Sequence, residues 1–138
     1  MLLLIIAAFV VAVDQFTKYL VTSNMSEGMG IPIIDGIFHL TFILNPGAAF
    51  GILENNRWFF VVTALSVLIF LFYYRRTIMA ESKLVQMGIA LFAGGALGNL
   101  IDRIRTGLVI DFFDFRIWPI FNVADIAICL GVGLILWS

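Results

Sequence analysis

Four aspartates lie within a stretch of 24 residues in the C-terminal third of this chain. They are Asp102, Asp111, Asp114 and Asp125. The chain around them is 62% apolar, with a mean hydropathy of +1.09. Charged groups are costly to place beside hydrocarbon, so a cluster of carboxylates in such a chain indicates a functional site.

Asp111 and Asp125 are the two carboxylates that could act together. Asp111 lies in the apolar run 108–113, a setting that disfavours the charged form and raises a carboxyl pKa. Asp125 lies near the start of an apolar segment, where a helix dipole favours negative charge. Brought together, the two could share one proton. An aspartic protease uses such a pair, one carboxylate activating water and the other protonating the scissile carbonyl. A proton relay in a transporter has the same requirement, so both chemistries stay open, and Asp114 is expected to face water in a loop.

Other polar residues are spaced to share helix faces. Asp14 and Lys18 are one helical turn apart and can neutralise each other inside a membrane, as a clamp between helices or as part of a site. Asn99, Asp102 and Arg103 follow at i, i+3 and i+4 and predict a polar face at one helix end. Arg103 can hold a carboxylate bidentately, and Asp102 with Arg103 can also be an ordinary interface pair.

Composition excludes several other kinds of site. His39 is the only histidine and Cys129 the only cysteine, so neither a metal site nor a disulfide framework is expected. The eight Lys and Arg are scattered and the net charge is -1, which gives no basic patch for nucleic acid. We therefore expect no cofactor, no metal and no nucleic-acid partner.

The elements that must position these residues are predicted to be membrane-spanning helices. The composition predicts an α-helical integral membrane protein, a single membrane domain over residues 1–138. Four apolar segments approach the ~17–25 residues that spanning requires. They are residues 2–21, 58–74, 84–100 and 119–137. Gly94, Gly95 and Gly98 are expected to let a neighbouring helix approach closely.

The connections predict an orientation and a small sheet. The connection 75–83 is basic and is placed in the cytoplasm, which puts both termini there and residues 22–57 and 101–118 on the other side. Within the first outer connection, the segment 31–50 is rich in β-formers around the turn signal Asp35-Gly36. A small extracytoplasmic β-sheet or hairpin is therefore expected.

Taken in order, these motifs closely resemble those of bacterial lipoprotein signal peptidase, also called signal peptidase II. The matching sets are Asp14-Gln15-x-x-Lys18, Asn45-x-Gly47-Ala48-Ala49-Phe50, Gly94-Gly95-Ala96-x-Gly98-Asn99-x-x-Asp102-Arg103, Val109-x-Asp111-Phe112 and Phe121-Asn122-x-Ala124-Asp125. The match covers almost the whole chain, and its specificity comes from the joint agreement of order and spacing.

The resemblance implies an aspartic endopeptidase of the bacterial cytoplasmic membrane that needs no cofactor. Its implied substrate is a diacylglyceryl-modified prolipoprotein, cleaved immediately before the lipidated cysteine. The implied catalytic pair is Asp111 and Asp125. The residues implied to hold substrate or inhibitor are Asn45, Gly47, Asn99, Arg103 and Asn122, with support from Asp14, Lys18 and Asp102.

The resemblance also implies inhibition by globomycin and a site near the outer leaflet, among membrane lipids. We expect a monomer. We further expect residues 38–50, with Phe42 and Phe50, to form a clamp over the substrate. The main alternative is a small proton-coupled transporter with Asp14, Asp111 and Asp125 as its relay, although four spans without an inverted repeat fit it poorly. A non-catalytic scaffold is the third possibility.

Overall fold

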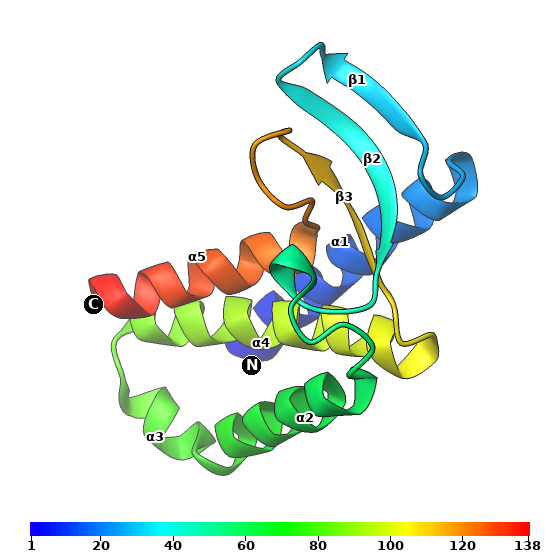
Figure 1. The fold of residues 1–138 in the computed structure, drawn as a ribbon. Helices are drawn as coiled ribbons and strands as arrows, with labels where there is room; N and C mark the ends of the chain where they lie inside the picture. The colour runs from blue at the N-terminus through cyan, green and yellow to red at the C-terminus, as the bar shows by residue number, and fades with distance from the viewer.

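The computed structural model describes all 138 residues, which form helices and one small antiparallel sheet (Figure 1). In chain order the elements are α1 (Leu2–Asn24), β1 (Gly30–Ile34), β2 (Phe38–Asn45), the 3-10 turn η1 (Ala49–Gly51), α2 (Arg57–Tyr73), α3 (Arg75–Ala80), α4 (Lys83–Arg105), β3 (Val109–Asp114) and α5 (Val123–Trp137).

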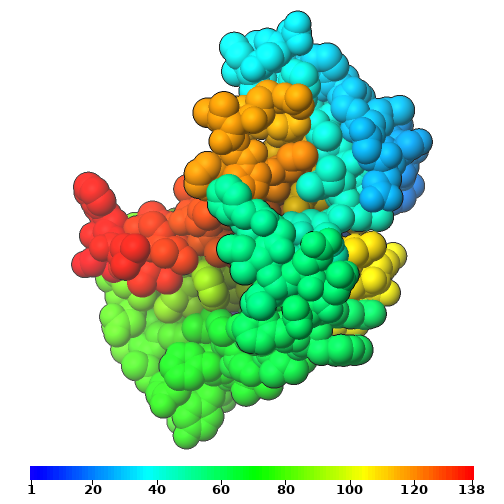
Figure 2. Space-filling model, in the orientation of Figure 1, coloured from blue at the N-terminus to red at the C-terminus, as the bar shows by residue number.

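Helix α4 is the central helix, packed against α1, α2 and α5. The sheet stands beyond one end of the helices, and both chain termini lie toward the other end (Figure 1). Figure 2 shows the sheet and its connecting segments projecting from the helical part. This arrangement places the segments that carry Asp111 and Asp125 at the junction between helices and sheet.

Small residues permit the close contacts of α4. A Cβ at Gly94 would lie 2.8 Å from Cβ of Val10 on α1, and one at Gly88 would lie 2.7 Å from the Gly131 carbonyl oxygen on α5. Gly95 faces the Ala124 carbonyl oxygen still more closely. The predicted role of the glycines in helix packing is confirmed.

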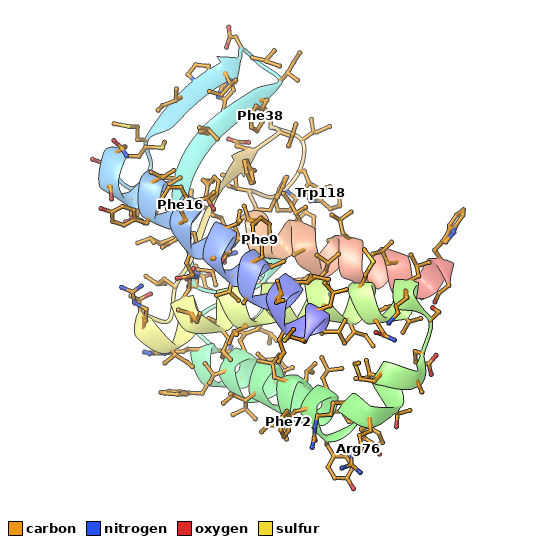
Figure 3. All side chains as sticks on the ribbon, turned by 180° about the vertical axis from the view of Figure 1, so that it is seen from behind. Phe9, Phe16, Phe38, Phe72, Arg76 and Trp118 are labelled. Atoms are coloured by element: carbon orange, nitrogen blue, oxygen red, sulfur yellow. The ribbon has the colours of Figure 1, made fainter.

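The helices carry apolar side chains on their outer surfaces, and Figure 3 shows them around the whole helical part. Phe9, Phe16 and Phe72 are exposed. Two helices, α1 and α4, each 23 residues long, have the length and composition to cross a membrane. Helices α2 and α5 are apolar but shorter, with 17 and 15 residues.

Helix α5 begins four residues later than the predicted span 119–137, so the first part of that prediction is wrong. Asn122 caps the helix: its side-chain oxygen accepts from the Asp125 N–H at 3.0 Å, while its own N–H donates to Asp125 Oδ2 at 3.1 Å. Such a capping box fixes where a helix starts. Phe121 just before it forms a β-bridge with Phe113 instead.

The connection 101–118, predicted as a loop, contains the last turns of α4 and the whole of β3. Strand β3 pairs antiparallel with β2, with Asp111 opposite Ile43, and β2 also pairs with β1 around the predicted Asp35-Gly36 turn. The expectation that Asp114 faces water is wrong. Its carboxylate is buried, accepts from Thr41 Oγ1 at 2.6 Å and pairs with Arg116 at 2.8 Å.

Candidate active site

Lys18 lies at the centre of a buried polar cluster between α1 and α4. Its Nζ lies 2.8 Å from Asp14 Oδ2, 2.9 Å from Asp102 Oδ2 and 3.0 Å from Asn99 Oδ1. An ammonium group has three N–H donors, so each of them has an acceptor here. The predicted Asp14–Lys18 pair therefore forms, and Asp102 joins it from α4.

The two carboxylates around Lys18 also hold the segments that carry the other two aspartates. Asp14 Oδ1 accepts from the Ala124 N–H at 2.9 Å, at the start of α5. Asp102 Oδ2 accepts from the Ile110 N–H at 3.1 Å, in β3. The start of α5 and strand β3 are thus fixed to the same ion cluster, one residue away from Asp125 and Asp111 respectively.

Gln15 is a member of this cluster that the sequence analysis did not single out as a site residue. Its Nε2 lies 3.1 Å from Asp14 Oδ2 and 3.0 Å from Asp102 Oδ1, and it also donates to the Gly98 carbonyl. Its place beside Asp14 in the first motif was the available signal. Gly98 leaves the space for this packing, because a Cβ there would lie 2.5 Å from Asp14 Oδ2.

Asn122 lies between Asp111 and Asp125 and contacts both. Its Nδ2 donates to Asp111 Oδ1 at 2.7 Å, and its backbone N–H and side-chain oxygen form the capping box with Asp125. Asn99 completes the arrangement, donating to Asp125 Oδ1 at 2.9 Å while its own Oδ1 accepts from Asn122 and Lys18. The fully buried Asn122 therefore orients both carboxyl groups, that of Asp111 through its side-chain amide and that of Asp125 through its backbone N–H.

The other oxygen of Asp111 is held by Asn45, whose Nδ2 donates to Asp111 Oδ2 at 3.0 Å. Asn45 Oδ1 accepts from the Gly47 N–H at 2.9 Å, and Arg103 Nη2 donates to the Gly47 carbonyl at 3.3 Å. A Cβ at Gly47 would lie 2.7 Å from the Ile52 carbonyl oxygen, so this turn requires glycine. The connection between β2 and α2 is thereby attached to the carboxylate.

Arg103 does not form the predicted bidentate pair with a carboxylate. Its guanidinium donates to Gly47 and lies 4.5 Å from the centre of the Phe60 ring, a cation–π contact with α2. Helical spacing places Arg103 on the polar face of α4 but gives no information about the loop that carries Gly47. The hydrogen bond from Arg103 to Gly47 could therefore not be predicted from the sequence.

The environment of Asp111 favours its protonated form. Burial in the junction, followed by the negative charge of Asp125, raises the pKa of Asp111 to about 7, against the opposing hydrogen bonds of Asn45 and Asn122 and the charge of Lys18. Two carboxyl groups coupled in this way titrate as a pair. Near neutral pH the pair can therefore hold one proton and one negative charge.

A groove of about 530 Å³ adjoins the carboxylates through Asn45. The connection after β2 forms one side and the segment after β3 the other, and Figure 2 shows these two segments together. The Phe50 and Trp118 rings lie edge to face across it, with centroids 6.0 Å apart. Phe50 is 74% exposed, whereas Phe42 is buried with Val21 and Phe112, so the expectation that Phe42 faces a substrate is wrong.

All ten predicted site residues belong to one hydrogen-bonded cluster. These are Asp14, Lys18, Asn45, Gly47, Asn99, Asp102, Arg103, Asp111, Asn122 and Asp125. No group of three His, Cys, Asp or Glu side chains in the chain could hold a metal ion. The arrangement holds two oriented carboxyl groups, and Asn45, which lines the groove, is hydrogen-bonded to one of them, that of Asp111.

The sequence profile of a family described as signal peptidase (SPase) II matches residues 6–138. The chain belongs to this family. Relatives named lipoprotein signal peptidase include one from Moorella thermoacetica, 48% identical over 136 residues that cover 98% of this chain and 90% of the relative. Another, from Pelotomaculum thermopropionicum, is 46% identical over 140 residues, covering 100% of this chain and 91% of the relative.

Solved structures agree with the family assignment. A bacterial membrane enzyme determined at 2.3 Å resolution superposes with a TM-score of 0.89 at 38% identity, covering 98% of this chain and 85% of that one. A second, at 1.9 Å, gives a TM-score of 0.84, also at 38% identity, over 98% of this chain and 90% of that one. Of the three hypotheses from the sequence, the family assignment supports the protease and not the transporter or the scaffold.

Proposed function

We propose that the chain is the membrane endopeptidase that removes signal peptides from diacylglyceryl-modified prolipoproteins, with Asp111 and Asp125 as an aspartic catalytic pair. The single observation that carries the catalytic assignment is that Asn122 hydrogen-bonds both carboxyl groups at once. The names of the relatives support the substrate class.

The chemistry requires one ionised and one protonated carboxyl group. The ionised group takes a proton from water, whose oxygen attacks the carbonyl carbon before the lipidated cysteine. The protonated group gives its proton to the carbonyl oxygen. As the tetrahedral intermediate collapses and the C–N bond breaks, the cysteine nitrogen receives the proton that was taken from water. The former carbonyl oxygen returns its proton to the other carboxyl group, which restores the pair. Asn45, Asn99 and Asn122 orient the two groups throughout, and a raised pKa at Asp111 supplies the proton near pH 7.

The membrane arrangement follows from the same proposal. We place α1, α2, α4 and α5 across the bilayer as one domain, with both termini on the cytoplasmic side. The basic connection 75–83 between α2 and α4 supports this orientation, because short basic connections favour the cytoplasmic side. The carboxylates then lie near the outer leaflet, where a lipid-modified substrate arrives by lateral diffusion. A monomer contains every residue of the cluster, and a globomycin-like peptide inhibitor would bind in the groove beside Asn45.

A cleavage assay with purified protein and lipidated prolipoprotein tests the catalytic pair. We expect the wild type to release the signal peptide. Asp111→Asn and Asp125→Asn should each lose activity by at least about 10³-fold, since neither amide can replace an exchanging proton. Asp35→Asn is the matched control, because Asp35 is fully exposed in the hairpin turn and lies outside the cluster.

The result that overturns the aspartic assignment is cleavage by a folded Asp111→Asn or Asp125→Asn variant at a rate near that of Asp35→Asn. Loss of cleavage in all four proteins, with substrate confirmed as lipidated, would reject the substrate class itself. Folding of each variant is checked by its thermal unfolding curve in detergent.

Because Phe42 is buried, the expected clamp of residues 38–50 over the substrate is tested at Phe50. Phe50→Ser removes the exposed ring that faces Trp118 across the groove and should raise KM severalfold while leaving kcat within about twofold, because the ring touches neither carboxylate. Phe59→Ser, an exposed phenylalanine on α2, is the control. Equal KM values for Phe50→Ser and wild type would exclude Phe50 from substrate binding.

A further inference from the structure

A second cavity lies at the opposite end of the helices from the carboxylates. It has a volume of about 740 Å³, within the range of ligand pockets. Helices α1, α2, α3 and α4 all contribute to it. Representative lining residues are Leu4, Ala7, Leu68, Phe72, Ile89 and Ala93.

Two arginines supply the only charged side chains of this cavity. Arg75 and Arg76 are the first two residues of α3, one residue after α2 ends, and the other lining side chains are apolar. Figure 3 shows Phe72 and Arg76 at this end, far from Phe38 of the sheet. Neither arginine has a carboxylate partner.

Arg75 is held in place without using up its donors. Its Nη1 donates to the Phe72 carbonyl at 2.9 Å, and its guanidinium lies 4.4 Å from the centre of the Phe72 ring. A guanidinium has five N–H donors, so most remain for an anion. Arg76 is exposed and makes no side-chain hydrogen bond in the structure. The two guanidinium groups therefore have N–H donors free beside an apolar space.

From this geometry we infer that the cavity binds one anionic phospholipid, with an acyl chain between α1, α2 and α4 and its phosphate on Arg75 and Arg76. An apolar space open to a bilayer fills with hydrocarbon, since it offers water no polar partners. Charge selects the occupant. A signal peptide carries a basic n-region, which the two arginines would repel. The lipid would brace α2, which packs mainly on α4.

The test uses the full chain in phosphatidylcholine nanodiscs with a trace of phosphatidylglycerol that carries a photoactivatable acyl chain. Peptides containing Leu68–Phe72 and Ile89–Ala93 should become labelled, and unlabelled phosphatidylglycerol should compete while added phosphatidylcholine should not. Each arginine beside an anionic lipid contributes roughly fivefold in association. Arg75→Gln with Arg76→Gln should therefore lower the labelling preference by about fivefold to 25-fold.

Arg105→Gln is the charge-matched control, because Arg105 is exposed at the other end of α4. It should leave the labelling of these peptides unchanged. Ala93→Phe fills the cavity while keeping both arginines and should abolish the labelling. Thermal unfolding supplies a second readout: phosphatidylglycerol should raise the Tm of the wild type and of Arg105→Gln, but not of the double arginine variant.

Three results would overturn the inference. One is equal labelling by phosphatidylglycerol and phosphatidylcholine probes. Another is labelling that the double arginine variant retains in full. The third is displacement of the label by a signal peptide and not by phosphatidylglycerol, which would assign the cavity to substrate.

Discussion

At the residue scale, the site depends on neutral amides that organise charged groups. Asn122 and Asn99 each contact Asp125, and Asn122 also contacts Asp111, so neither carboxyl group is free to rotate. Buried polar groups of this kind must be fully hydrogen-bonded to be tolerated. The same network links the carboxyl groups to Lys18 through Asn99.

The raised pKa of Asp111 predicts a pH dependence of cleavage. The proposed mechanism needs one proton on the pair, so activity should fall above about pH 7 as that proton is lost, and fall again at acid pH as the second carboxylate is protonated. The profile of kcat/KM against pH measures this. A rate that keeps rising from pH 7 to 9 would contradict it.

The same shift predicts that stability falls with rising pH. The folded chain holds the Asp111 proton up to about pH 7, whereas the unfolded chain releases it near 3.8. Its contribution is present below 3.8 and is lost as pH rises to about 7, and Asp111→Asn should flatten this part of the Tm-against-pH curve. Identical curves for the two proteins would show that Asp111 is ionised in the fold.

Removing the central cation should be strongly destabilising. Lys18→Met leaves Asp14 and Asp102 buried without their shared partner, which costs about 3–5 kcal/mol. The control is Lys83→Met, at an exposed position. Thermal unfolding in detergent compares them, and equal Tm values would mean that the cluster is not an ion pair in the folded protein.

The sequence was sufficient to predict which residues form the cluster. It was not sufficient to predict all of their hydrogen-bond partners. Asp14 and Lys18 meet within one helix, so their spacing was sufficient. The buried Asp114 carboxylate accepts a hydrogen bond from Thr41, 73 residues away, and no local sequence pattern contains that contact. The hydrogen bond from Arg103 to the Gly47 carbonyl is likewise a contact between distant parts of the chain, which local spacing does not reveal.

At the scale of elements, the helices were predicted from hydropathy and the strand β3 was not. Residues 109–114 were assigned to a loop because they lie between two predicted spans, yet four of the six are β-branched or aromatic, and the segment pairs with the open edge of β2. The start of α5 was missed because a capping residue, and not hydropathy, decides it.

The packing of α4 against α5 predicts opposite outcomes for two glycines on one helix. A Cβ at Gly131 would lie 2.5 Å from the Gly88 carbonyl oxygen and 2.7 Å from the Phe92 nitrogen, whereas one at Gly133 meets nothing within 4 Å. Gly131→Ala should cost about 1–3 kcal/mol by overpacking. Gly133→Ala should be neutral or stabilise by up to about 1 kcal/mol. Equal unfolding temperatures would mean that the helices separate in the membrane.

At the scale of the whole molecule, the sheet and the basic connection 75–83 lie at opposite ends of the helices (Figure 1). The proposed orientation can therefore be tested by labelling one residue at each end. In a Cys129→Ala background, Asp35→Cys should react with an impermeant maleimide in intact cells. Glu81→Cys should react with the maleimide only after the membrane is permeabilised. The reverse pattern would invert the proposed topology.

The intrahelical pairing of Asp14 with Lys18 bears on biosynthesis. The other carboxylate on Lys18, that of Asp102, lies on α4, so when α1 enters the bilayer its cation has only Asp14, four residues away, to neutralise it. An ion pair already closed within the first helix lowers the cost of inserting that helix alone. The later arrival of α4 then recruits a preformed salt bridge, and proteolytic competence follows only once the last helix has emerged from the ribosome.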